Sequence, residues 1–315
     1  MIDKNTQYSP LFKVNNLSVS FRMYDSKLGQ SDLEVVSDLT VSVNEGEVLA
    51  IVGSSGSGKS LLAHTVLGIL PGNTTISGDM YYKGEILTEK MLKELRGKEI
   101  ALVPQSTAYL DPLMKVGKQV RGTDKSLSRR ISQKKIFKRF ELEESVDKLY
   151  PFQLSGGMAR RVLVSTAVIS DAKLIIADEP TPGMSMAQAM EALQVFRELA
   201  NEGKGVILIT HDIDLAVHFA DKIAVFYGGT TLEVAPVSDF SKGIDYIRHP
   251  YSKALWNALP QNGFTPIAGS QPYAGTVNEG CVFAPRCHSK KDKCLYERPE
   301  IKELRNGYVR CFYAN

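Results

Sequence analysis

The stretch Gly-Ser-Ser-Gly-Ser-Gly-Lys-Ser at residues 53–60 matches the pattern G-x-x-x-x-G-K-[ST], and it decides the fold. An apolar run of strand length, residues 47–52, precedes it. A buried-helix pattern, residues 61–70, follows it and stops at Pro71-Gly72. This is the context in which a glycine loop and a helix N-terminus hold phosphate. The stretch therefore predicts a site for a nucleoside triphosphate.

Each residue type in this loop has a task in such a site. The glycines let backbone N–H groups turn toward phosphate oxygens, while Lys59 reaches the terminal phosphates and the Ser60 hydroxyl ligates magnesium. A flexible Gly/Ser turn before an ordinary helix is the alternative, and the flanking patterns disfavour it. The expected nucleotide contacts are Gly53, Ser54, Gly56, Ser57, Gly58, Lys59 and Ser60.

Length and composition exclude several classes of protein. The chain has 315 residues, of which 43% are hydrophobic and 23% charged, as in ordinary soluble globular proteins. Its net charge of +3 is too small to argue for nucleic acid. The first residues lack the pattern of a signal peptide, and no apolar stretch approaches the roughly 20 residues of a membrane span. We therefore expect any membrane association to depend on a partner.

Polar residues follow three further apolar strand patterns: Gln105, Asp178 with Glu179, and His211. Because ligands bind at the carboxyl ends of strands in open α/β sheets, we expect these side chains to converge on the phosphate loop. Gln105 is suited to reach the nucleotide metal, and Asp178 suits the magnesium shell. Glu179 is suited to orient an attacking water, and His211 to contact the terminal phosphate. The alternative, ordinary solvated strand ends, is disfavoured by the loop upstream.

A second anion-binding geometry stands at Ser155-Gly156-Gly157, where a long helix pattern begins. Free N–H groups and the positive end of the helix dipole favour phosphate there. Two phosphate-binding helix starts in one chain are redundant unless the second serves the nucleotide of another subunit.

Residues 106–154 have a different character from the segments around them. They carry basic runs followed by acidic residues, with helix-compatible spacing and few strand formers. We interpret them as a small helical insert whose charges form a solvated face, in preference to a nucleic-acid surface.

All four cysteines lie near the end of the sequence, at Cys281, Cys287, Cys294 and Cys311. Without an export signal, disulfides are disfavoured, and four clustered thiols suggest a metal site. The spacing lacks the C-x-x-C pairs of common zinc sites and does not match a standard ferredoxin run. The residues alone leave zinc and an iron–sulfur cluster open.

Taken in order, these motifs resemble those of the ATPase subunit of an ABC transporter. In that family's terms they are Walker A (Gly53–Ser60), the Q-loop (Gln105), the signature (Leu154–Met158), Walker B (Leu174–Asp178), the catalytic carboxylate (Glu179) and the switch histidine (His211). The resemblance implies an α/β fold, an ABC-type P-loop nucleotide-binding domain with an antiparallel β subdomain and a small helical insert. It also implies a head-to-tail pair holding two ATP molecules with Mg²⁺, each between the Walker motifs of one subunit and the signature of the other.

Two positions depart from the family pattern. Met158 stands where glutamine is usual in the signature, and we expect a mild effect. Ser185 stands where the D-loop normally has an aspartate that spans the dimer interface. We therefore expect the two ATP sites of the assembled pair to be unequal.

The end of the chain looks like the tail of oligopeptide, dipeptide and nickel importers, on the evidence of residues 249–259 and 280–287. Residues 67–71 and 149–152 are similar to nickel-importer ATPases within that group. The resemblance implies an ATPase domain over residues 1–240 and an importer-type extension with the four cysteines over 241–315. It favours a [4Fe–4S] cluster over Zn²⁺ at those cysteines, in a structural role.

The implied function is ATP hydrolysis that powers the uptake of peptides, nickel or a metal chelate. The implied partners are a second, distinct ATPase subunit (a heterodimer), two membrane permeases and an extracytoplasmic solute-binding protein, with the chain at the cytoplasmic face of the membrane. The alternative is a soluble ABC ATPase acting on nucleic acid or ribosomes. Members of that class carry two ATPase domains or long coiled coils, which this sequence lacks, so we expect no nucleic-acid partner.

Overall fold

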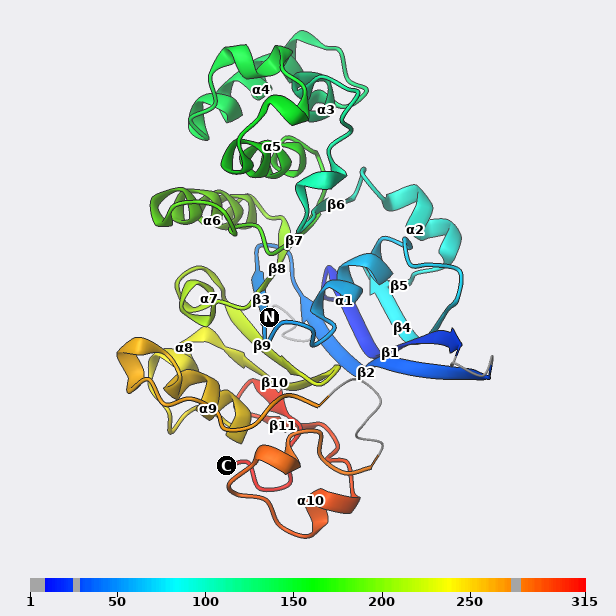
Figure 1. Ribbon diagram of the computed structural model, residues 1–315, viewed down its shortest axis with the longest axis vertical. Coiled ribbons are helices and arrows are strands. Elements are labelled where there is room, and N and C mark those ends of the chain that lie inside the picture. Colours follow the sequence, from blue (N-terminus) through cyan, green and yellow to red (C-terminus); the bar gives the residue numbers. More distant parts are fainter. Residues whose placement is uncertain (1–8, 25–28, 273–278) are drawn as a thin grey trace, which may run out of the picture.

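The computed structural model describes residues 9–24, 29–272 and 279–315. Within them the chain forms two sheets flanked by helices (Figure 1). The larger sheet has eight strands in the order β11-β12-β10-β9-β3-β8-β7-β6, and the smaller has four in the order β2-β1-β4-β5. The predicted α/β architecture is confirmed.

Five neighbouring strands of the larger sheet run parallel. Almost every residue in them is buried, as expected for a parallel sheet covered on both faces. They are β3 (Val48–Val52), β6 (Ile100–Val103), β7 (Leu174–Asp178), β8 (Gly205–Thr210) and β9 (Lys222–Tyr227).

Helices cover the two faces of this sheet unequally. On one face α1 (Lys59–Val66) lies in the core shared with the smaller sheet, where Leu62 belongs to the same buried cluster as Ile51 and Leu17. On the other face three helices fill the second core: α5 (Gly156–Val168), α6 (Met186–Asn201) and α7 (Ile213–Phe219). The phosphate-loop helix is thus held between two sheets.

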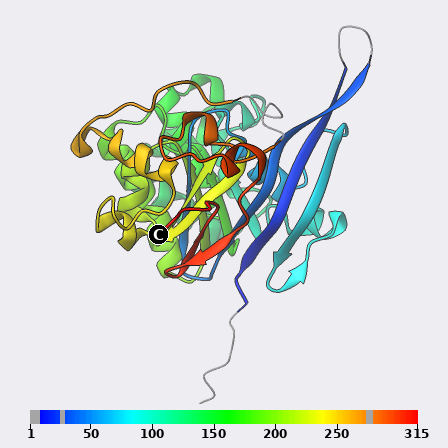
Figure 2. The ribbon, with the colours of Figure 1, turned by 90° about the horizontal axis from the view of Figure 1, so that it is seen from below.

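The smaller sheet is the predicted antiparallel subdomain. It consists of β1 (Phe12–Tyr24), β2 (Gln30–Val43), β4 (Thr74–Tyr82) and β5 (Glu85–Ile86), with the short helix α2 (Glu89–Leu95) after it. Figure 2 shows β1 and β2 projecting as a long hairpin beyond the body of the molecule. Their inner halves alternate between buried and less buried residues, as expected for a sheet with one face on the core.

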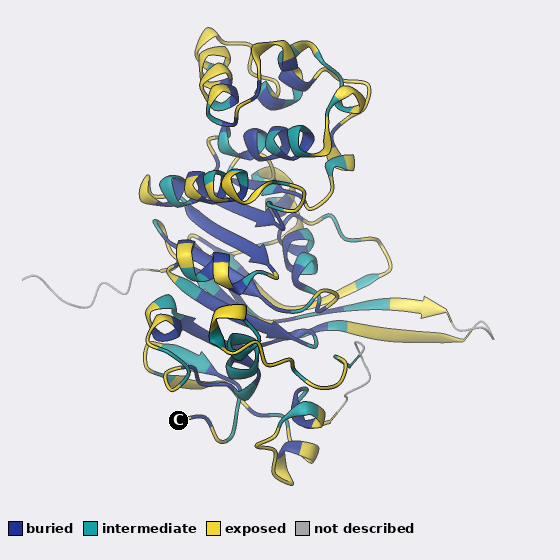
Figure 3. Ribbon diagram, turned by 60° about the vertical axis from the view of Figure 1, so that its left-hand side comes forward, coloured by how far each residue is buried: buried dark blue, intermediate teal, exposed yellow. Residues whose placement is uncertain are grey.

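The insert at residues 106–154 is helical, as predicted. It contains α3 (Val116–Arg121), α4 (Leu127–Arg139) and short 3-10 turns at Thr107–Tyr109, Glu144–Lys148 and Pro151–Gln153. With α5 it forms a lobe at one end of the molecule, and its outer surface is largely exposed (Figure 3). The basic residues Arg129, Lys134 and Arg139 of α4 form ion pairs with acidic residues of the same chain.

The end of the chain extends the larger sheet. Strand β10 (Thr230–Pro236) pairs antiparallel with β9, and β12 (Gly307–Val309) with its neighbour β11 (Lys302–Leu304) continues the sheet beyond it. Between them lie α8 (Val237–Ser241), α9 (Pro250–Asn257) and α10 (Lys293–Tyr296). The segment with α10 lies at the end of the molecule opposite the helical lobe (Figure 1). The domain boundary at residue 240 stays a prediction.

Two details differ from the sequence expectation. The helix predicted over residues 61–70 ends at Val66, because Gly68 takes a left-handed conformation with φ of +59° that stops it. The strands after residue 220 were not predicted. No helix among the described residues has the length and apolar character needed to cross a membrane.

Candidate functional site

The phosphate loop connects the end of β3 to the start of α1. Its shape requires glycine at two positions. A Cβ at Gly53 would collide with the carbonyl oxygen of Phe226, and Gly58, which caps α1, has φ of +95°. Lys59 Nζ donates hydrogen bonds to the carbonyl oxygens of Gly53 and Ser54, both at 2.8 Å, so its ammonium group lies inside the curve of the loop.

The predicted magnesium residues lie together. Ser60 Oγ donates a hydrogen bond of 3.1 Å to Oδ1 of Asp178, the last residue of β7. Burial raises the pKa of the Asp178 carboxyl and lowers the pKa of Lys59. Both shifts arise from placing charge in a poorly solvated site, and a divalent cation bound to the hydroxyl and carboxylate oxygens would offset the cost at Asp178.

Glu179 and His211 form a hydrogen-bonded pair. His211 Nδ1 lies 2.9 Å from both carboxylate oxygens of Glu179. The Glu179 side chain is almost buried, whereas that of His211 is 60% exposed, so the pair joins the interior to the surface. Glu179 has φ of +45°, a left-handed conformation that is uncommon for a residue with a side chain. The backbone thus leaves the extended strand conformation at Glu179, directly after β7.

The structure brings half of the predicted ATP-site residues into one cleft of about 310 Å³. Its lining includes Gln105 and Glu179 from two strand ends and the phosphate loop from Ser55 to Leu61. Asp178 and His211 do not line the cleft themselves. Asp178 is hydrogen-bonded to Ser60, and His211 to Glu179, and both of these partners line it. The strand ends therefore converge on the phosphate loop, as the sequence predicted.

The Ser-Gly-Gly segment does not line this cleft. Ser155 caps α5, accepting a hydrogen bond on Oγ from the Met158 amide, and both Ser155 and Gly156 are exposed. A Cβ at Gly157 would lie 3.5 Å from the carbonyl oxygen of Gly183, so this helix start lies beside the turn that precedes Ser185. The exposed residues Ser155 and Gly156 are accessible to a second molecule.

Ser185, the residue at the D-loop position, has a structural task of its own. Its hydroxyl accepts a hydrogen bond from the Gln188 amide, and the Gln188 side chain accepts one from the Ser185 amide. This reciprocal capping box begins α6. Aspartate is also a good helix cap, so the substitution at this position does not follow from helix stability.

Arg160 is a residue near the site that the sequence analysis missed. It is buried in α5, and its Nη1 donates a 2.9 Å hydrogen bond to the carbonyl oxygen of Pro104, directly before Gln105. Burial lowers the pKa of its guanidinium, while the carboxylates of Asp178 and Glu179 oppose that shift. Its position two residues after Met158, and two residues before the apolar run Val162–Val164, was the signal available.

The end of the chain also reaches the phosphate loop, and this was missed too. Ser54 Oγ donates a hydrogen bond to the side-chain oxygen of Gln271, and Ser54 also lies close enough to the Tyr251 hydroxyl to lower its pKa, against the larger raising effect of burial. The Tyr251 ring packs against Tyr227 and Phe283, with ring centroids 4.5 and 5.2 Å apart. Residues far beyond the loop in sequence therefore support its outer side.

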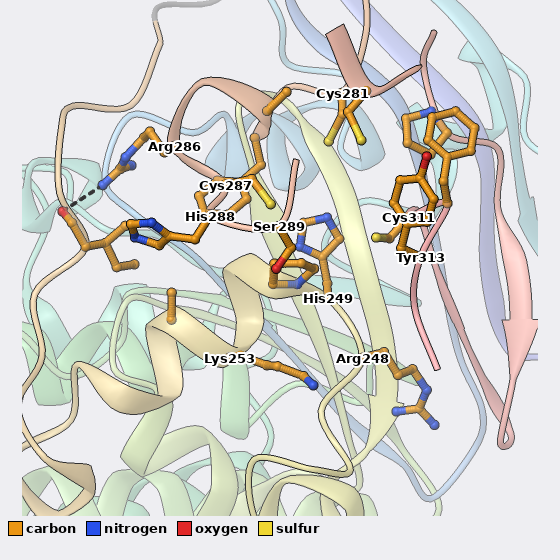
Figure 4. Close-up of a pocket in the computed structure, with 18 of the residues that line it drawn as sticks. Arg248, His249, Lys253, Cys281, Arg286, Cys287, His288, Ser289, Cys311 and Tyr313 are labelled. Carbon is orange, nitrogen blue, oxygen red and sulfur yellow. Dashed lines mark hydrogen bonds between the residues drawn. The ribbon is translucent and has the colours of Figure 1, made fainter. Parts of the chain in front are cut away.

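The four cysteines line a single cavity of about 390 Å³ (Figure 4). They come from separate short elements: Cys281 and Cys287 flank the 3-10 turn Ala284–Arg286, Cys294 lies in α10, and Cys311 follows β12. All four are free thiols. Figure 4 shows Cys281, Cys287 and Cys311 together with His249 around the same hollow.

The environment of these thiols is apolar and supplies amide hydrogen bonds. Burial raises the pKa of Cys281 to about 11, and the other three thiols lie close enough to add to that shift. The amide of Phe283 donates to Cys281, and the amide two residues on donates to the sulfur at Cys287 and Cys311 in the same way. Such N–H groups stabilise a thiolate once a cation is present.

The predicted metal itself is not confirmed. Within residues 9–24, 29–272 and 279–315, no group of three or more His, Cys, Asp or Glu side chains is arranged to hold a metal ion. The structure brings the four cysteines to one cavity, but their sulfurs do not form the close set that a single ion requires.

A buried ion-pair network fixes the segment that leads into this cavity. Arg248 is wholly buried, with Nη2 at 2.7 Å from Asp239 and Nη1 at 3.4 Å from Glu233. Its guanidinium also donates to the carbonyl oxygens of Leu304 and Arg305, and so joins α8 to the last strands.

Comparison with protein families gives two matches. A model described as ABC transporter matches residues 36–182, and one described as oligopeptide/dipeptide transporter, C-terminal region, matches residues 232–294. The first spans the phosphate loop through Glu179. The second spans α9 and three of the four cysteines.

Individual relatives match over almost the whole chain. The oligopeptide transport ATP-binding protein OppD of Escherichia coli is 34% identical over 332 residues, covering 97% of this chain and 94% of that protein. A peptide import ATP-binding protein of Brucella abortus is 33% identical, covering 95% and 93%.

Among solved structures, the dimeric ABC transporter cassette MJ0796 is similar with a TM-score of 0.63 and 27% identity, covering 72% of this chain and 98% of that one. The same cassette in a post-hydrolysis state with ADP and phosphate gives the same values.

Proposed function

The chain belongs to the ABC transporter family, as an ATP-hydrolysing subunit of an importer, and on that premise we propose that it powers the uptake of peptides. The observation that carries this proposal is the cleft in which the phosphate loop, Gln105 and Glu179 meet, in a chain whose end matches the oligopeptide/dipeptide transporter C-terminal region. Relatives that match along nearly the whole chain are named for peptide import.

We assign the following roles to the site residues. Lys59 and the loop amides hold the phosphates, while Ser60 and Gln105 ligate magnesium and Asp178 organises its shell. Glu179 polarises the attacking water, and His211 contacts the terminal phosphate. The hydrogen bonds from Ser60 to Asp178 and between His211 and Glu179 support this division, because each joins two residues assigned to neighbouring tasks.

We propose that a second ATPase subunit completes each ATP site. Ser155 and Gly156 are exposed, and none of Ser155, Gly156 and Gly157 lines the chain's own cleft, which supports a role toward the partner's nucleotide. Because the chain has serine at position 185, the partner need not be identical, and a heterodimer with unequal sites is our preferred assembly. An equimolar complex of this chain with one other ATPase, isolated from native membranes, would support it, and recovery of this chain alone would contradict it.

We propose that the helical lobe docks on permease subunits, which hold the chain at the cytoplasmic face of the membrane. Several apolar side chains of the lobe are exposed, including Leu113 at 88%, Phe152 at 74% and Tyr109 at 55%. Exposed apolar groups gathered on one lobe are typical of a docking surface. An extracytoplasmic solute-binding protein would deliver the substrate to those permeases.

Uptake by a strain that lacks this gene tests the function directly. We would measure accumulation of radiolabelled dipeptide, oligopeptide and nickel in parallel, with plasmid complementation as the control. Loss of peptide uptake alone supports the proposal. Loss of nickel uptake alone would assign the chain to a metal importer instead, on the likeness of residues 67–71 and 149–152 to nickel-importer ATPases.

For the cysteine cavity we propose a [4Fe–4S] cluster, with Zn²⁺ as the alternative. Four thiols, amide donors at three of them and a cavity of about 390 Å³ fit such a group. A tetrahedral zinc, with Zn–S distances of about 2.3 Å, needs its sulfurs within about 4 Å of one another. The described side chains contain no set that tight. A cluster binds one iron per cysteine and accepts a wider spacing.

When bound, the cluster would link the three short segments that carry the cysteines, a structural role. Iron, acid-labile sulfide and zinc should be measured on protein purified without oxygen. About four iron atoms and four sulfides per chain are expected for this cluster type. One zinc per chain without iron would contradict it.

A further inference from the structure

His249 is the residue that caps helix α9, and its task there fixes which ring nitrogen carries the proton. The amide of Tyr251 donates a 3.0 Å hydrogen bond to His249 Nδ1. Because Nδ1 accepts, the proton of the neutral ring is on Nε2. The backbone amide of His249 is also held, by a 2.8 Å hydrogen bond to Glu233. The ring therefore has a defined position and tautomer.

The donor at Nε2 is buried without a partner. His249 is 1% exposed, and its Nε2 has no hydrogen-bond partner among the described residues. Burial lowers the pKa of its ring to about 3, so the ring is neutral at physiological pH. Buried donors are almost always paired in folded proteins, so an exception calls for a ligand.

The cavity that His249 faces is the one lined by the cysteines. His249, Cys281, Cys287, Cys294 and Cys311 all line it, and the labelled side chains surround one hollow in Figure 4. The ring packs against Phe283, with ring centroids 5.9 Å apart, so its movement is restricted. The Nε2–H group is therefore available to a group bound in this cavity.

We propose that His249 donates its Nε2–H hydrogen bond to a sulfur of the iron–sulfur cluster held by the four cysteines. This inference rests on the cluster proposed above and adds a fifth residue to that site, a positioning and tuning residue rather than a ligand. The acceptor is a cysteine thiolate or a bridging sulfide. Hydrogen bonds to cluster sulfurs stabilise the more negative, reduced state and so raise the reduction potential.

The variant that tests this is His249→Asn, measured on the full chain purified without oxygen. Asparagine places an oxygen near the position of Nδ1 and keeps the helix cap, but it has no group at the position of Nε2. His288→Asn is the matched control, because His288 lines the same cavity but is exposed, whereas His249 is buried. Each protein is titrated with dithionite, a one-electron reductant of the cluster, after its iron and sulfide content has been measured.

We expect iron and sulfide to be unchanged in His249→Asn and its cluster to be about tenfold harder to reduce, equivalent to 59 mV for one electron. His288→Asn should match the wild type. Equal potentials in all three proteins at equal iron content would overturn this inference and leave the cluster proposal standing. A wild-type chain without iron would overturn both.

A second measurement needs no substitution and covers the case in which His249→Asn does not fold. In protein containing ¹⁵N-labelled histidine, pulsed electron paramagnetic resonance of the reduced cluster should detect one histidine nitrogen coupled through the hydrogen bond. The signal should persist in His288→Asn. Its absence from the loaded wild-type protein would overturn the inference.

Discussion

The phosphate-loop cleft and the cysteine cavity are built in opposite ways. The cleft takes most of its residues from one contiguous stretch, residues 53–60, and adds single residues from the ends of parallel strands. The cavity takes its four thiols from three short segments that share no regular layer. One site is held by the core of the sheet, and the other lacks such support.

The difference shows where each site obtains its rigidity. Around the phosphate loop, buried parallel strands on both sides fix the backbone before any ligand arrives. Around the cysteines, the ordering comes from isolated contacts such as the amide of Cys281 on the carbonyl oxygen of Cys294 and the buried Arg248 network. A bound group therefore contributes more to folding at the cavity than at the cleft.

The largest expected effect separates the two sites completely. Glu179→Gln should abolish ATP turnover, by about a hundredfold or more, because the carboxylate beside His211 can no longer polarise water. ATP binding and iron content should be unchanged. Hydrolysis by the assembled complex and nucleotide binding by calorimetry are the measurements. Retained turnover would mean that the partner's site carries hydrolysis, and altered iron content would break the comparison.

The next effect is on stability and falls on the cavity. Arg248→Leu should lower the free energy of unfolding by about 3–5 kcal/mol, because it leaves the buried carboxylates of Glu233 and Asp239 uncompensated. Chemical denaturation checks this. Lys90→Met is the control, since Lys90 forms an exposed pair with Glu94 and its loss should cost almost nothing. Equal losses in both variants would show that the network does not hold this region.

A smaller effect tests the contact between the two regions. Gln271→Ala removes the acceptor of the Ser54 hydroxyl, and a net hydrogen bond contributes about 1 kcal/mol. We expect ATP to bind about fivefold more weakly, because the loop loses a support that orders it in advance. Gln261→Ala is the control, since Gln261 bonds Asp214 away from the loop. Unchanged ATP affinity would show that the tail lies beside the loop without supporting it.

The smallest effect concerns the inequality of the paired sites. Ser185→Asp should leave the free energy of unfolding within about 0.5 kcal/mol, because aspartate also caps α6. The ATPase rate of the assembled pair should nevertheless change about twofold or more, since a carboxylate returns to the dimer interface. An unchanged ATPase rate would contradict the prediction that Ser185 makes the two ATP sites unequal.

The sequence predicted the cleft well because its signals are local. A buried strand, a glycine loop and a helix occupy consecutive residues, and Gln105, Glu179 and His211 each follow an apolar run. These residues then lie close together, because the carboxyl ends of parallel strands meet at the same edge of the sheet. Burial on both faces made these strands easy to recognise, and only the end of α1 was misplaced.

The contacts of the last third of the chain could not be read in the same way. Strands β11 and β12 have three residues each, which is too short for a hydrophobic period. Gln271 lies in an irregular segment, and His249 caps a helix although histidine is not among the usual capping residues. Their partners lie far away in the sequence, so tertiary packing decides their positions.

The start of helix α9 has a consequence that extends beyond either site. His249 lines the cysteine cavity, and the hydroxyl of Tyr251, two residues later, lies close to Ser54 of the phosphate loop. A displacement of this one helical turn would change both the cysteine cavity and the phosphate loop. By thermodynamic reciprocity, any factor by which an occupied cavity changes ATP affinity is the same factor by which ATP changes the affinity of the cavity for its occupant. The coupling free energy between the two can therefore be measured from whichever side is easier to titrate.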